Sequence, residues 1–130
     1  MADKLPHFVS KVPTAKWAVN RKFIGEWSIT QLEGFDAEYL NLCGPSVIKI
    51  SPGGIGEMNF GAVEIVLDCK MDDLNEHVLR FSFEGSDEGD PISGRGYSFN
   101  EGREMTGRIF LYCGDEFGFK AKKIKKVGRA

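Results

Sequence analysis

The chain has 130 residues, of which 42% are hydrophobic and 28% charged, a balance typical of one folded domain and not of a chain that is disordered throughout. Its 16 glycines and 10 phenylalanines favour many short strands joined by tight turns. No apolar stretch reaches the roughly 18–20 residues that span a bilayer, and the first residues lack the apolar core of a signal peptide. We therefore expect no membrane span and a cytoplasmic location.

Charge is segregated along the chain. Residues 1–22 carry five basic and one acidic side chain, residues 23–119 carry six basic and eighteen acidic ones, and residues 120–130 carry six basic ones. An acidic body repels polyphosphate, which disfavours nucleic acid as its partner. The three cysteines are odd in number and widely spaced, so they predict reduced, mostly packed thiols and neither a disulfide framework nor a Cys-x-x-Cys motif.

The pattern divides the chain into an N-terminal arm (1–22), a single β domain (23–121) and a basic C-terminal tail (122–130). The arm contains Pro6 and Pro13, shows no sustained period, and predicts at most one short helix from Thr14 to Asn20, with Trp17 as its anchor on the body. In the tail, the basic run either contacts an anionic partner, folds back on the acidic body or is simply solvated.

Apolar and polar residues alternate in the β domain with the period of two that is typical of half-buried strands. A turn is expected at Glu33-Gly34, one or two helical turns at 36–42, a hairpin at Pro52-Gly53-Gly54 and a loop from Glu84 to Pro91. The expected strands cover 23–30, 46–51, 55–60, 63–70, 78–84, 93–99, 105–112 and 117–121.

About eight strands with short connections predict antiparallel neighbours, because a parallel pair needs a long crossover. The predicted fold class is therefore all-β, an antiparallel up-and-down meander that closes into a calycin-like barrel. A flattened two-sheet sandwich is the alternative. At this size the interior of a barrel is either filled by side chains or holds one small ligand.

Two resemblances support this fold. The segment 23–27 (Phe-Ile-Gly-Glu-Trp) resembles the Gly-x-Trp opening of lipocalin and avidin-like calycin barrels, in which an Arg on the final strand packs over the Trp; Lys120 or Lys122 meets that pattern loosely. Residues 23–121 also resemble a family of small uncharacterised bacterial proteins with a similar start and a stretch similar to 83–96. The second resemblance implies no activity.

The densest chemical feature is the acidic segment 84–90. Glu84, Asp87 and Asp90, together with Glu88, form a glycine-containing carboxylate cluster of the kind that hard cations such as Ca²⁺ prefer, although its spacing is not that of an EF-hand. A solvated acidic hairpin is the default interpretation. An enzyme that uses Asp87 or Asp90 as a proton acceptor and Arg95 as an anion stabiliser is the third functional hypothesis.

A ligand site is predicted on the aromatic strands. Arg95 lies on the same strand face as Tyr97 and Phe99. If this face points into the barrel, the buried Arg95 guanidinium either pairs with the acidic segment or binds a ligand carboxylate. The candidate ligand-binding residues are Trp27, Arg95, Tyr97, Phe99 and Tyr112. Filling of the core is the alternative use of the aromatic residues.

Other chemistries lack their motifs. The two histidines, His7 and His77, form no zinc-binding spacing, no serine lies in Gly-x-Ser-x-Gly, and the glycine-rich segments match neither a P-loop nor a dinucleotide fingerprint, so no cofactor is predicted. The sequence favours a non-enzymatic binding module for a small apolar or weakly anionic molecule. The alternative is a homo-oligomeric interaction module that uses an exposed row containing Phe110 and Tyr112.

Overall fold

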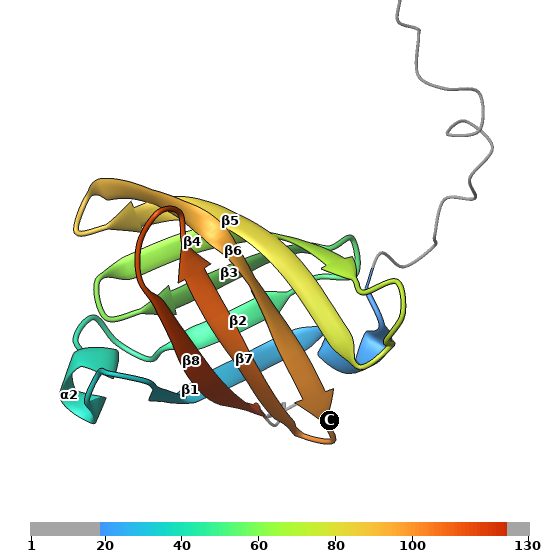
Figure 1. Ribbon diagram of the computed structural model, residues 1–130. Helices are drawn as coiled ribbons and strands as arrows, with labels where there is room; N and C mark the ends of the chain where they lie inside the picture. Colours follow the sequence, from blue (N-terminus) through green and yellow to red (C-terminus); the bar gives the residue numbers. More distant parts are fainter. Residues whose placement is uncertain (1–18, 125–130) are drawn as a thin grey trace, which may run out of the picture.

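The computed structural model describes residues 19–124 as a closed barrel of eight antiparallel strands, in which each strand pairs with its neighbours in sequence and β8 returns to β1 (Figure 1). This confirms the predicted all-β barrel. Within this part of the chain, the elements are the 3-10 turn η1 (Arg21–Phe23), β1 (Gly25–Leu32), the short helix α2 (Ala37–Leu40), β2 (Val47–Ile50), β3 (Ile55–Phe60), β4 (Val63–Met71), β5 (Val78–Asp87), β6 (Asp90–Glu101), β7 (Glu104–Leu111) and β8 (Glu116–Lys123).

The period of two in the sequence determines which side chains face the lumen. In β4, Ile65, Leu67 and Cys69 are buried, while the intervening Val66 and Asp68 are exposed. The predicted helical turn is present as α2, and the Asp36 side chain caps it by accepting a hydrogen bond from the backbone N–H of Tyr39 at 2.9 Å. Trp17 and most of the predicted Thr14–Asn20 helix lie in residues 1–18, outside the described residues. Most of the basic tail, residues 125–130, also lies outside them.

The predicted loop from Glu84 to Pro91 is wrong. Strand β5 continues to Asp87, β6 begins at Asp90, and only Glu88 and Gly89 form the turn, with φ values of 54° and 88°. Two consecutive positive φ angles define a type I′ turn, whose twist matches that of the flanking strands. The acidic and glycine content of this segment indicated a loop, but the dihedral angles restrict the turn to two residues.

Strand β6 directs its larger side chains outward. Arg95, Tyr97 and Phe99 occupy the outer face, whereas the glycine at 96 and the polar side chains Ser98 and Asn100 are buried. The conditional placement of Arg95, Tyr97 and Phe99 on an inward face is therefore wrong. The reason is that large rings from the neighbouring strands already occupy the lumen.

Glycines lie directly opposite phenylalanines on neighbouring strands of the barrel. The cross-strand pairs are Phe83–Gly94, Phe81–Gly96 and Phe119–Gly107. A Cβ atom on Gly96 would lie 2.6 Å from the Phe81 ring and 2.5 Å from a backbone oxygen, so only glycine permits this approach. These close approaches fill the middle of the lumen with rings.

The barrel has one closed end, where β1 begins. Phe23 of η1 and Trp27 are both fully buried there, and the Trp27 indole N–H donates to the Phe23 carbonyl at 3.0 Å. Lys123 on the final strand lies over the Trp27 ring, with its Nζ 4.8 Å from the ring centroid, and donates to the Ile24 carbonyl. The cation over the tryptophan is therefore Lys123, not Lys120 or Lys122, which are both exposed.

Candidate functional site

A small apolar cavity lies at the opposite end of the barrel, which we call the mouth. It has a volume of about 80 Å³ and lies beneath the segment that joins β1 to β2 and contains α2. In Figure 1 this segment projects at the end of the barrel away from the described N-terminal residues. The cavity is lined by aromatic and aliphatic side chains and one carboxylate: Phe35, Tyr39, Phe60, Val63, Ile65, Phe83, Asp87, Ile92, Ile109, Leu111 and Phe117.

Two aromatic side chains form a roof over this cavity. Phe35 and Tyr39 stack with ring centroids 5.0 Å apart, and Phe35 meets Phe117 edge-to-face at 5.4 Å. The chain reaches this position because the Phe35 N–H donates to the Leu32 carbonyl at 3.0 Å and because the Tyr39 ring packs directly on Gly61, whose φ is 54°. The roof is partly open, since Phe35 is 39% exposed and Tyr39 is half-buried.

Among the residues that the structure describes, Asp87 contributes the only charged side chain of the cavity wall. It continues the inward phase of Leu79, Phe81 and Phe83 along β5, and it is half-buried. Across the type I′ turn it pairs directly with Asp90. The sequence prediction missed this role because it ended the strand at Glu84, although extending the alternation through Gly85 places residue 87 inside.

The five predicted ligand-binding residues do not share a site. Trp27 is buried at the closed end, Tyr112 lies in the turn after β7 with 76% of its surface exposed, and the other three lie on the outer face of β6. Arg95 packs over the Phe110 ring at 4.8 Å, and among residues 19–124 no ion pair joins it to the acidic hairpin. Neither predicted use of Arg95, the salt bridge or the lumen clamp, is found in the described residues.

The outer aromatic face borders an open groove of about 870 Å³ on β6, β7, β8 and the end of β1. Arg108 lines this groove and pairs with Glu33 at 3.4 Å and with Glu116 at 3.2 Å. The Glu33 carboxylate also accepts the Gly118 backbone N–H at 2.8 Å. The arginine of this groove is therefore already neutralised by two carboxylates.

The acidic hairpin does not form a metal site in the described residues. Glu84 lies on the exposed outer face of β5, opposite in phase to Asp87, and residues 19–124 contain no group of three or more metal-ligating side chains. The convergence on one cleft that the enzyme hypothesis requires is likewise absent from this part of the chain, because Arg95 faces outward.

The cysteines are free thiols, but two of them are not packed. Cys43 and Cys113 are exposed, which contradicts the prediction for them, and only Cys69 is buried. Burial raises the pKa of the Cys69 thiol to about 12, and the adjacent Asp68 carboxylate also raises it. A buried thiol with this pKa is an inert core group.

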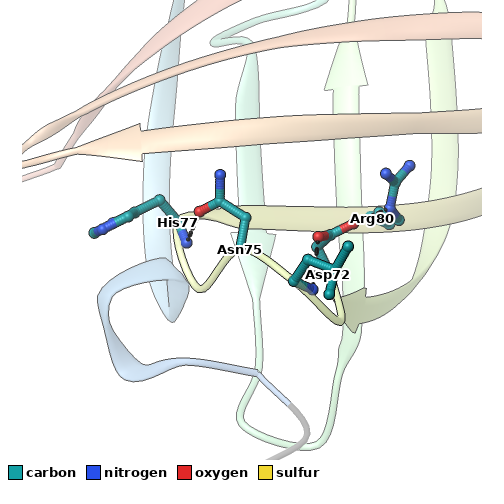
Figure 2. A network of polar contacts seen from close by, with 5 residues as sticks. Asp72, Asn75, His77 and Arg80 are labelled. Atoms are coloured by element: carbon teal, nitrogen blue, oxygen red, sulfur yellow. Dashed lines mark hydrogen bonds and ion pairs between the residues drawn. The ribbon is translucent and has the colours of Figure 1, made fainter.

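A polar network shapes the turn between β4 and β5 at the closed end (Figure 2). Asp72 accepts a hydrogen bond from Arg80 at 2.6 Å and one from the Leu74 N–H, and Asn75 accepts the His77 N–H at 2.8 Å. The hydrogen bond from Arg80 lowers the pKa of Asp72. These contacts hold the turn in shape and join it to β5, and we assign them a structural role.

The fold and the mouth define an eight-stranded antiparallel barrel with one closed end and a roofed apolar cavity at the other. No protein-family model, no curated protein and no solved structure matches the chain. Over residues 19–124, no helix is long and apolar enough to cross a lipid bilayer.

Proposed function

We propose that this protein is a non-enzymatic binding module that takes up a small, largely apolar molecule at the barrel mouth. The observation that carries the proposal is the apolar cavity under Phe35 and Tyr39. Ligand pockets are mostly apolar and contain few placed polar groups, and barrel mouths are a common location for them. A weakly anionic ligand has less support, because Asp87 is the only charged group that residues 19–124 place in the wall.

The calycin resemblance is part of this proposal. A Trp near the start of the first strand, covered by a cation from the last strand, is the arrangement that the resemblance implies, and the contact between Trp27 and Lys123 supports it. In this view the Trp27 end closes the barrel and leaves the mouth as the entrance.

Titration with xenon, an apolar probe of a single atom, followed by NMR of the full chain, tests the proposal. We expect saturable shifts for residues of the mouth, and loss of these shifts in an Ile92→Phe variant, whose larger ring fills the cavity. Ile55→Phe is the matched control, since Ile55 is 56% exposed on the outer face of β3. Equal binding by the wild type and Ile92→Phe, or no saturable binding by the wild type, would refute the proposal.

A homo-oligomeric interaction module is the second candidate, and the outer face of β6 and β7 favours it. Tyr97 lies 6.2 Å from Phe110, which in turn lies under Arg95, and Tyr, Phe and Arg are enriched at the centres of interfaces. Sedimentation of the wild type at micromolar concentration tests this candidate, with Tyr97→Ser expected to dissociate the oligomer and Val66→Ser, on β4, as control. A monomeric wild type would exclude it.

A further inference from the structure

Aromatic rings form much of the wall of the mouth cavity. Phe35, Tyr39, Phe60, Phe83 and Phe117 all line it. Phe117 contacts both Phe35 and Phe60 edge-to-face, at centroid distances of 5.4 and 5.9 Å. The faces of aromatic rings carry negative potential and attract a cation within about 6 Å, and several rings around one space form the cage that recognises organic ammonium groups.

The same wall carries a carboxylate without a cationic partner in the described residues. No ion pair or side-chain hydrogen bond of Asp87 occurs within residues 19–124, and no Lys, Arg or His lines the cavity. Asp90 stands directly opposite Asp87 in the hairpin, and like charges at paired positions destabilise a sheet. Negative charge is therefore concentrated at the mouth at a cost to the hairpin.

These two observations select the same chemistry. An anionic ligand would be repelled by Asp87, and a neutral one would leave the carboxylate unpaired, whereas a cation gains from both the rings and the carboxylate. We propose that the mouth cavity binds an organic cation, with an alkylammonium group inside the ring of aromatic side chains and its charge near Asp87. This inference rests on the proposed function and specifies the class of ligand.

The volume limits how much of the ligand enters. An apolar cavity of about 150 Å³ holds benzene, so about 80 Å³ accommodates only a few heavy atoms. A small ammonium group fits this space. The remainder of a larger ligand would extend out of the cavity beside Phe35, the more exposed residue of the roof.

Three probes of one shape and different charge test the inference on the full chain. They are choline, its neutral carbon isostere with a tert-butyl group in place of the trimethylammonium group, and the anion tert-butylacetate. Titrations by NMR give the three dissociation constants. We expect choline to bind about tenfold more tightly than the neutral alcohol, which corresponds to about 1.4 kcal/mol, and the anion to bind more weakly than both.

Two variants test whether the Asp87 carboxylate causes the preference for choline. Asp87→Asn keeps the shape of the side chain and is expected to weaken choline binding about tenfold while leaving the neutral isostere unchanged. Glu84→Gln removes the same charge from the outer face of the same strand and is expected to change neither.

The outcomes separate this inference from the proposed function. The cation preference is overturned if the neutral isostere binds as tightly as choline, or if Asp87→Asn and Glu84→Gln weaken choline binding equally. Either result leaves the apolar site in place. Absence of saturable binding for all three probes and for xenon overturns both.

Discussion

The phenylalanine rings that fill the middle of the lumen require glycine on the facing strand, and this requirement predicts the cost of adding one methyl group. In Gly96→Ala the new Cβ would lie 2.6 Å from the Phe81 ring and 2.5 Å from the Arg108 carbonyl oxygen. Both distances are far below van der Waals contact, so the ring and the backbone must move. Overpacking of this kind costs about 1–3 kcal/mol.

We expect Gly96→Ala to lower the free energy of unfolding by about 2 kcal/mol. With a urea dependence of about 2 kcal/mol per M, the midpoint of unfolding falls by about 1 M. Gly53→Ala is the matched control, because nothing lies within 4 Å of its Cβ position and its φ is not positive. It should be neutral or stabilising by about 0.4–1 kcal/mol.

A double-mutant cycle identifies the ring as the source of the cost. Phe81→Leu removes the ring atoms that a Cβ on Gly96 would meet and leaves the Arg108 carbonyl oxygen in place, so Gly96→Ala should cost about 1 kcal/mol less in that background than in the wild type. A Gly96→Ala protein within 0.5 kcal/mol of the wild type would refute the reasoning and indicate a lumen with free space beside Phe81.

Two further predictions concern the hairpin turn and the buried thiol. Glu88→Asn should raise the free energy of unfolding by about 1 kcal/mol in urea titrations, because Glu88 has a φ of 54° that asparagine tolerates better; a loss of stability would contradict the type I′ assignment. The folded-state pKa of Cys69 lies above its ordinary value of 9.0, so its contribution to stability is full below pH 9 and is lost as the pH rises toward about 12, by up to about 1.4 kcal/mol per pH unit. Cys69→Val should remove this part of the alkaline slope, and identical slopes for the two proteins would refute it.

The sequence predicted the barrel well because strand periodicity and short connections are local signals. The spacing of Ile65, Leu67 and Cys69 at every second position indicates a strand with one buried face, and this signal does not depend on distant parts of the chain. Closure follows from the number of strands and the lengths of the turns. The position of the helical turn was also predictable, since Asp36 caps it through its own neighbour Tyr39.

The site was harder to predict because it depends on which face of β6 is inside. Arg95, Tyr97 and Phe99 alternate with small residues, and large residues more often mark the buried face. Here the buried face of the partner strand carries Phe81 and Phe83, which need the glycines opposite them. The side chains of the neighbouring strand therefore determine which face of β6 is buried, and no pattern within β6 alone reveals it.

The pairing of Asp87 with Asp90 connects the stability of the hairpin to the mouth. Two carboxylates at directly opposed positions repel each other, and relieving such a pair is worth about 0.2–1 kcal/mol. We expect Asp90→Asn to stabilise the free protein by about 0.5 kcal/mol and to do so less at high salt, where exposed charges are screened.

Urea unfolding of Asp90→Asn at low and high ionic strength measures this effect. Asp90 is exposed and lies outside the cavity wall, so the variant should retain the preference for choline over the neutral isostere, whereas Asp87→Asn should gain similar stability and lose the preference. A destabilised Asp90→Asn protein would show that the pair is held by a favourable contact instead. A gain in stability by both variants, with the preference for choline lost only in Asp87→Asn, would show that the Asp87 carboxylate destabilises the hairpin and yet is required for cation binding.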